Sequence, residues 1–285
     1  MNKFIFKLFL LILTIIILYS SGVYFLKNNL KNEILKSDSL ILGDSHTMFI
    51  NLPKSFNYSN YGFPYIIHYN FINEFKEIIK NKRVFLVYSH NNISKEFQNR
   101  FDDNNLKPNW LSMVNQNLNS FSLLPNKYYK QYEWYNPYAG IFNKSKFDKL
   151  TLKNNINTSK VSTDTILFSK KIIEHYTDLK YVNDDTIQLE YLFKTINILK
   201  KNNCEIILIN TPKTKYYTNN IPSKIIEKYE RILKKLNLKY LELNAILNKE
   251  LDPSCFMDAD HTNAKGDLII NNYLKNNDTL FSPIR

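Results

Sequence analysis

The sequence predicts an α/β protein with a three-layer, doubly wound and mostly parallel sheet. Two observations lead to this prediction: short, continuous apolar runs recur along the chain, and amphipathic segments with helical spacing separate them. Continuous apolar strands with polar ends are typical of a parallel sheet that helices cover on both faces. Ligands of such sheets bind beyond the carboxyl ends of the strands, so residues that follow a strand are the first candidates for a site.

The strands and helices alternate along the chain. Strands are expected in Ser39–Leu42, Val84–Tyr88, Cys204–Pro212 and Lys239–Leu243. Helices are expected over Phe71–Lys80, Thr186–Lys201 and Pro222–Leu236, and a last apolar helix follows His261. The third of these helices has its apolar residues at three- and four-residue steps and a proline near its start. Strands that alternate with such helices indicate a doubly wound layer structure.

The N-terminus resembles a membrane anchor. Leu8–Leu26 contains nineteen residues without a charge, preceded by Lys3 and Lys7, and this length spans the hydrocarbon core as a helix. We expect an uncleaved anchor over residues 1–27; the alternative is a cleaved signal peptide, although no Ala-x-Ala site follows. Residues 28–38 form a polar linker or a juxtamembrane helix. In either case a single N-terminal span predicts that the main domain lies outside the cytoplasm.

Residues 39–285 are expected to form one domain with an insertion at about 100–185. The insertion contains both Trp residues and many Tyr residues but no long strand pattern. Insertions of this kind form substrate lids or partner surfaces, and the alternative is a helical decoration that packs on the core.

Charge and cysteine content exclude several classes of function. The net charge of +12 comes with lysines spread along the chain and with no nucleic-acid-binding motif, so we expect a solvated basic surface and no nucleic-acid partner. Cys204 and Cys255 are the two cysteines and have no C-x-x-C spacing. No metal site, cofactor or disulfide framework is therefore expected, with pairing of these two in an oxidising compartment as the alternative.

Two motifs at opposite ends of the domain carry the chemistry. "GDSHT" follows the first strand, and "DADHTNAKG" precedes the last helix. Together and in this order they resemble the SGNH/GDSL hydrolase superfamily, whose fold is flavodoxin-like. The resemblance implies that Ser45 is a nucleophile, His261 its general base, and Asp258 the carboxylate that orients the imidazole. Asp260 competes for the last role, but direct adjacency to His261 makes it less suited to reach the far ring nitrogen.

The resemblance also implies an oxyanion hole. In the superfamily it consists of the backbone N–H of the nucleophile, a glycine N–H from a second motif and an asparagine side chain from a third. Ser45 supplies the first and Gly62 stands for the second, although it lies close to Ser45 in sequence. The third motif, Gly-x-Asn-Asp, is replaced here by "YSHNNIS". Asn91 is the first choice for the donor and Asn92 the second.

The remaining histidines have simpler interpretations. His46 and His90 would form a metal pair if both faced the site, but no third ligand accompanies them, so no metal is expected. His68 and His175 lie in amphipathic surroundings that favour a structural role with satisfied hydrogen bonds. Asp44 is expected to hold the turn through local hydrogen bonds.

The resemblance implies acyl transfer through an acyl-serine. Membrane-anchored members of the superfamily add or remove acyl groups on envelope polysaccharides. We therefore expect a membrane-anchored serine esterase or O-acyltransferase that acts on acetyl-like esters of cell-envelope glycans. The alternative is a catalytically weak or inactive envelope protein that uses the fold for binding or assembly. A lipase-like enzyme is a third interpretation, and no long apolar lid supports it.

Overall fold

The computed structural model describes residues 2–59, 62–94, 165–176 and 186–277. Of the expected insertion it describes α7, Thr165–Tyr176; the rest of the insertion lies outside the described residues. The description below therefore concerns the N-terminal helix and the α/β core.

The core is a five-stranded, all-parallel sheet with strand order β2-β1-β3-β4-β5. This is the flavodoxin-like doubly wound order, in which the topological switch point lies between β1 and β3. The strands are β1 Ser39–Gly43, β2 Ser55–Ser59, β3 Arg83–Val87, β4 Glu205–Asn210 and β5 Lys239–Glu242. The expected α/β class is confirmed.

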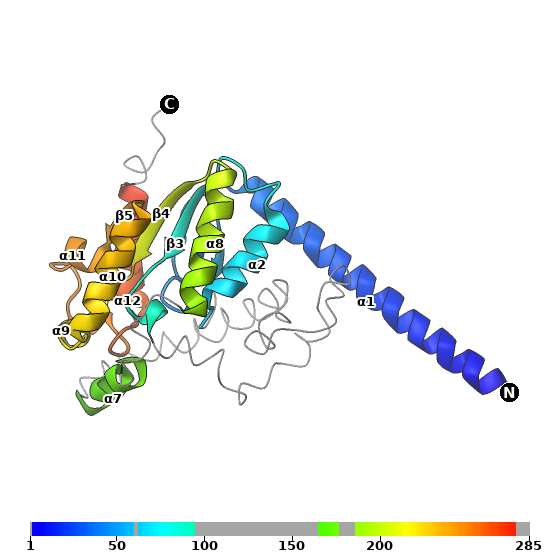
Figure 1. The fold of residues 1–285 in the computed structure, drawn as a ribbon, viewed down its shortest axis with the longest axis horizontal. Coiled ribbons are helices and arrows are strands. Elements are labelled where there is room, and N and C mark those ends of the chain that lie inside the picture. The colour runs from blue at the N-terminus through cyan, green and yellow to red at the C-terminus, as the bar shows by residue number, and fades with distance from the viewer. Residues whose placement is uncertain (1, 60–61, 95–164, 177–185, 278–285) are drawn as a thin grey trace.

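Two apolar clusters cover the two faces of the sheet. Leu40 and Leu42 point into one cluster and Ile41 into the other, as alternation along a strand requires. The first face carries α2 Tyr65–Phe75, α8 Ile187–Lys201 and α10 Ser223–Leu236; the second carries α11 Leu243–Ile246 and α12 Ala264–Asn276. Figure 1 shows α2 and α8 in front of the strands. Shorter elements are α9 Lys215–Asn219 and the 3₁₀ turns η1 Asn91–Ile93 and η3 Pro253–Cys255.

The sequence pattern misses one strand and misplaces one helix. The missed strand is β2: three of its five residues are half-buried and polar residues interrupt its aromatic ones, as an edge strand allows. The helix expected over Phe71–Lys80 runs instead over Tyr65–Phe75. Pro64 occupies the N-cap position, and the buried side chains begin directly after it at Tyr65.

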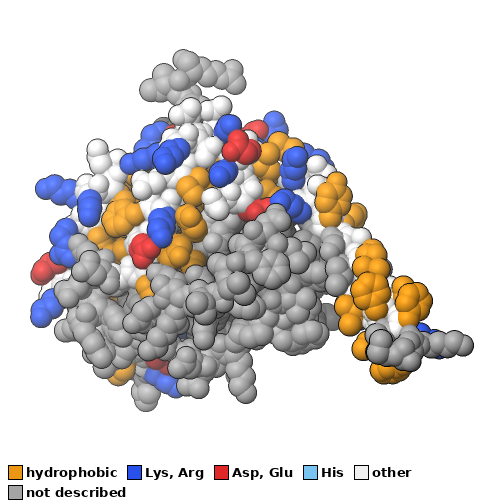
Figure 2. Space-filling model, turned by 45° about the vertical axis from the view of Figure 1, so that its right-hand side comes forward, with side chains coloured by type: hydrophobic (Ala, Val, Ile, Leu, Met, Phe, Trp, Pro, Cys, Tyr) orange, Lys and Arg blue, Asp and Glu red, His pale blue; other side chains and the backbone are white. Residues whose placement is uncertain are grey.

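The N-terminal residues form one helix, α1 Asn2–Lys36, which includes residues 28–36. At its C-terminal end Leu30 and Ile34 are buried against the first face, and Lys27 forms an ion pair with Glu74 of α2. Its N-terminal part projects from the domain and carries exposed hydrophobic side chains (Figures 1 and 2). Over the described residues, no helix combines the length and the apolar character that crossing a membrane requires.

Cys204 and Cys255 are both free. Cys204 is half-buried at the start of β4, and Cys255 is buried in η3. The alternative of a disulfide between them is therefore not realised.

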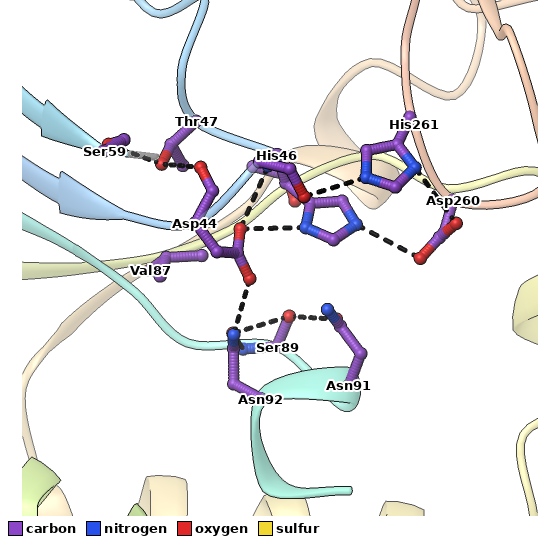
Figure 3. Close-up of polar contacts among 12 residues, drawn as sticks. Asp44, His46, Thr47, Ser59, Val87, Ser89, Asn91, Asn92, Asp260 and His261 are labelled. Carbon is purple, nitrogen blue, oxygen red and sulfur yellow. Dashed lines mark hydrogen bonds and ion pairs between the residues drawn. The ribbon is translucent and has the colours of Figure 1, made fainter. Parts of the chain in front are cut away.

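Gly43 ends β1 because a larger residue would not fit. A Cβ atom at this position would lie 1.7 Å from Thr47 Oγ1. That hydroxyl donates to Ser59 Oγ of β2 at 2.9 Å and so ties the turn after β1 to the neighbouring strand. The small residue thus allows the turn to fold back against the sheet (Figure 3).

We predict that Gly43→Ala destabilises the protein by about 1–3 kcal/mol, because the added methyl group overpacks the turn. Chemical denaturation followed by circular dichroism measures this loss. The double variant Gly43→Ala/Thr47→Ala removes the obstructing hydroxyl and should recover part of it. A Gly43→Ala variant as stable as the wild type would contradict the steric explanation.

Candidate active site

The candidate site lies at the carboxyl ends of β1 and β3. Asp44, Ser45 and His46 follow β1, and the segment Ser89–Asn92 follows β3. The loop that precedes α12 brings Asp258–His261 to the same edge of the sheet. This is the switch point of the sheet, where the two neighbouring connections diverge and leave room for a ligand.

Ser45, His261 and Asp258 form a chain of hydrogen bonds. Ser45 Oγ lies 2.9 Å from His261 Nε2, and His261 Nδ1 lies 3.0 Å from each carboxylate oxygen of Asp258. The structure thus brings together the three residues that the sequence placed at the two ends of the domain. A serine nucleophile is activated when its hydroxyl is hydrogen-bonded to a base and a carboxylate is hydrogen-bonded to the other side of that base.

The loop that carries His261 is held rigidly. The Asp258 carboxylate accepts the backbone N–H groups of Asp260, at 3.0 Å, and of His261, at 2.7 Å. At the start of α12, a Cβ atom on Gly266 would lie 2.5 Å from the carbonyl oxygen of Cys255. Gly266 therefore allows α12 to pack directly on η3, and this packing fixes the position of the loop.

Asp260 also reaches the imidazole of His261, contrary to expectation. Its Oδ1 lies 3.2 Å from His261 Nδ1, and its side chain is buried. The turn that Asp258 closes brings both carboxylates to the same ring nitrogen, so adjacency in sequence does not prevent the contact. Asp258 is hydrogen-bonded to His261 Nδ1, whereas Asp260 makes a slightly longer ion-pair contact with the same nitrogen.

His46 links the two ends of the site. Its Nδ1 lies 2.8 Å from Asp44 Oδ1, and its Nε2 lies 3.2 Å from Asp260 Oδ2. Its ring stacks on that of His261, with centroids 4.3 Å apart and planes 6° from parallel (Figure 3). His90, which the sequence paired with His46 as a weak metal alternative, stacks instead on Tyr229. Sequence reasoning missed the bridging position of His46.

The buried charges shift one another's protonation. Burial acts to lower the pKa of His261, but the Asp260 charge and the hydrogen bond to Asp258 outweigh it and raise this pKa to about 10. Burial acts to raise the pKa of Asp44, but His46 and Asn92 hold it well below its usual value. His261 is therefore protonated at neutral pH, and it must lose that proton before it accepts one from Ser45.

The two candidate asparagines have different contacts. Asn92 Nδ2 donates to Asp44 Oδ2 at 2.7 Å, so its amide is committed to the buried carboxylate. Asn91 Oδ1 accepts from Ser89 Oγ, which turns the amide nitrogen of Asn91 toward the histidine rings (Figure 3). These contacts favour Asn91 as the oxyanion donor. Gly62 has a φ of 59°, a conformation that favours glycine; its part in the oxyanion hole stays a prediction.

Among the residues that the structure describes, one group of side chains offers ligand atoms to a metal. Atoms of His46, Asp260 and His261 lie within 4.8 Å of one another. The ring nitrogens of both histidines already face Ser45 or a carboxylate. A cation there would have to displace contacts that orient His261 or that join His46 to Asp260.

The two other histidines lie away from this chain of contacts. His175 Nδ1 is hydrogen-bonded to the hydroxyl of Tyr217 in a buried cluster. His68 is fully buried against Phe63 and Tyr65, and neither ring nitrogen has a hydrogen-bond partner among the described residues. Burial lowers the pKa of His68 to about 4. The expected structural role fits both residues, but the hydrogen bonds expected of His68 are missing from the described part of the chain.

The chain matches no protein-family model and no curated protein. The likeness to SGNH hydrolases therefore rests on the residues of the site alone.

Asn91 and Asn92 can be distinguished by substitution. We predict that Asn91→Ala remains folded but lowers the rate of p-nitrophenyl acetate hydrolysis about a hundredfold, as loss of one oxyanion donor does. Asn92→Ala removes a donor from a buried carboxylate and should cost about 2–3 kcal/mol of folding stability. Unfolding curves beside initial rates measure both effects. The assignment fails if Asn91→Ala hydrolyses the ester at the wild-type rate.

The protonation of His261 predicts a rate that rises with pH. Only neutral His261 accepts the Ser45 proton, so a pKa of about 10 places the increase in the alkaline range. Asp260→Asn removes the negative charge that raises this pKa most, and the pH–rate profile should shift to lower pH. Asp38→Asn, an exposed carboxylate, is the matched control and should leave the profile in place. An Asp260→Asn profile that coincides with the wild type would exclude this role of Asp260.

Proposed function

We propose that this protein is a membrane-anchored serine esterase or O-acyltransferase of the SGNH type, acting on acetyl-like esters of cell-envelope glycans. The observation that supports the proposal is the chain Ser45 Oγ, His261 and Asp258, with separations of 2.9 Å and 3.0 Å, at the carboxyl edge of a parallel sheet. Serine-dependent acyl transfer needs this order of groups and no cofactor.

The geometry supports a two-step reaction. Neutral His261 accepts the proton of Ser45 at Nε2 while Ser45 Oγ attacks the ester carbonyl. The backbone N–H of Ser45 and the amide of Asn91 stabilise the oxyanion. When the tetrahedral intermediate collapses, the alcohol leaves with the proton from His261 and the acyl group stays on Ser45. Water or a sugar hydroxyl then attacks the acyl-serine, with His261 again accepting the proton, which gives hydrolysis or transfer.

The N-terminal helix is the proposed anchor. The uncharged stretch Leu8–Leu26 lies within α1, and this helix exposes large hydrophobic side chains, among them Phe4, Leu11 and Phe25. Exposed apolar side chains that cluster on one projecting helix are unfavourable in water and favour contact with lipid (Figure 2). We place the α/β domain outside the cytoplasm, where envelope glycans lie.

A second candidate is a binding or assembly protein with the same fold. The third motif lacks the glycine and the aspartate of the superfamily, and Asn92 is bound to Asp44 instead of facing a substrate. Loss of one oxyanion donor lowers rates strongly, so this departure favours a weak catalyst. Reactivity of Ser45 separates the two candidates.

We predict that the full-length protein in detergent is labelled by a fluorophosphonate at alkaline pH. Ser45 Oγ attacks phosphorus and fluoride leaves, which requires the activated hydroxyl. Ser45→Ala and His261→Ala should both abolish labelling, which gel fluorescence and mass spectrometry of the labelled peptide measure. Ser223→Ala, an exposed serine at the start of α10, is the matched control and should label like the wild type.

A folded wild-type protein that does not label would overturn the hydrolase proposal and favour the binding protein. Once labelling is established, p-nitrophenyl acetate and lipid vesicles distinguish the esterase from the lipase-like interpretation. Hydrolysis of the soluble ester without release of fatty acid from vesicles is the result that we expect.

A further inference from the structure

A cavity of about 920 Å³ lies beyond the carboxyl ends of β4 and β5, bordered by α9, α10 and α11. Much of its wall is apolar or aromatic, with Tyr216 and Tyr229 among the ring side chains. His90 and Phe256 also line it. His90 precedes Asn91, and Phe256 belongs to the loop of Asp258, so the cavity adjoins the candidate active site.

The wall contains a buried lysine. The side chain of Lys213 is only 4% exposed, and its Nζ donates to Asn210 Oδ1 at 3.3 Å and to the carbonyl oxygen of Thr211 at 3.2 Å. Both acceptors are uncharged. Among the residues that the structure describes, no carboxylate forms an ion pair with this amine. A buried ammonium group without a paired charge is unfavourable unless a ligand supplies that charge.

Glu242 is an acidic residue of the cavity wall, and its carboxylate is already hydrogen-bonded to other groups. Glu242 Oε2 accepts from Asn210 Nδ2 at 2.8 Å and from the hydroxyl of Tyr240, and its Oε1 accepts the N–H of Asn244 at 3.3 Å. Burial lowers the pKa of Lys213, whereas the charges of Asp260, Glu242 and Asp44 act to raise it. Among the described residues these three carboxylates act on the amine through their charge, and none forms an ion pair with it.

The position of Lys213 is fixed by the fold. Its backbone N–H donates to Asn244 Oδ1 at 2.8 Å, which ties the segment after β4 to α11. The following residue, Thr214, donates through both its N–H and its hydroxyl to the carbonyl oxygen of Ala259, at 3.0 and 2.8 Å. The segment of Lys213 is therefore hydrogen-bonded, through its neighbour Thr214, to the loop that carries His261.

We propose that this cavity binds an acidic sugar residue of the glycan substrate, with the carboxylate or phosphate of that sugar against Lys213 Nζ and its ring against the tyrosines. A charge-assisted hydrogen bond would satisfy the buried ammonium, and flat aromatic side chains pack against the apolar face of a sugar ring. The inference rests on the proposed function, because it names the class of glycan that would present its ester or its hydroxyl to Ser45.

Binding without turnover tests the inference. Full-length Ser45→Ala protein in detergent is titrated by calorimetry with D-glucuronate, glucose 6-phosphate and D-glucose. We expect at least one acidic sugar to bind and D-glucose to bind at least about tenfold more weakly, since a buried charged hydrogen bond is lost. The two acidic sugars distinguish a carboxylate from a phosphate as the preferred group.

Substitutions in the cavity wall show whether the acidic sugar binds next to Lys213. Lys213→Met should weaken the acidic sugar about tenfold or more, and Lys213→Arg, which retains the charge, should restore much of the affinity. Lys215→Met is the matched control: Lys215 also lines the cavity but its side chain is exposed, so its loss should change the affinity less than about threefold. Asn248→Asp adds a negative charge at an exposed position of the wall and should weaken acidic sugars without disturbing the fold.

Equal affinity for glucose and glucuronate, no binding of any of the three sugars, or affinities unchanged in both Lys213→Met and Asn248→Asp would overturn the inference. The proposed function is tested separately, by fluorophosphonate labelling. Fluorophosphonate labelling with no sugar binding removes only the acidic-sugar inference. Lys213-dependent binding without labelling would support the binding site in a protein that is not a hydrolase.

Discussion

The buried carboxylate of Asp44 is the contact on which the rest of the site depends. It is fully buried directly after β1, accepts the amide of Asn92 after β3, and accepts both the backbone N–H and the ring of His46. His46 extends the network to Asp260 in the last loop. One carboxylate therefore joins three segments that are distant in sequence. The sequence interpretation of Asp44 as a local turn former was incomplete, because its long-range partners appear only when the sheet has formed.

The same network sets the protonation of His261, the hydrogen-bond partner of Ser45. Two parallel imidazole rings lie among three carboxylates, those of Asp44, Asp258 and Asp260. Burial acts to lower the pKa of His261, but the charges of Asp260 and Asp258 outweigh it and raise this pKa to about 10. Asp258 orients the ring through hydrogen bonds, whereas buried Asp260 stabilises its positive charge. The site thus stabilises the imidazolium form of His261, which is the form that the proposed acyl transfer would generate, and this arrangement lowers the basicity available at neutral pH.

Sequence reasoning succeeded where local patterns carry the information. The continuous apolar runs predicted β1, β3 and β4, because strands buried on both faces need such residues, and a shorter run predicted the less buried edge strand β5. It missed the edge strand β2, which is half-polar. Motif spacing brought Ser45, Asp258 and His261 into one hypothesis, and the structure places them in contact. The position of His46 between two carboxylates could not be predicted, because Asp260 lies 214 residues away from it in sequence.

The burial of Lys213 could not be predicted from local sequence either, because the polar segment "NTPKTKYY" gives no sign of it and only the fold buries this lysine. Its position along the sheet shows how the two proposed sites are related. All five strands run parallel, so their carboxyl ends lie on one edge of the sheet. The proposed nucleophile Ser45 follows β1, the proposed oxyanion donor Asn91 follows β3, and Lys213 follows β4. A glycan held by its acidic group beyond β4 and β5 would extend along this edge toward Ser45. Parallel topology would in this way supply both the position of the acyl-serine and the direction from which a sugar hydroxyl approaches it.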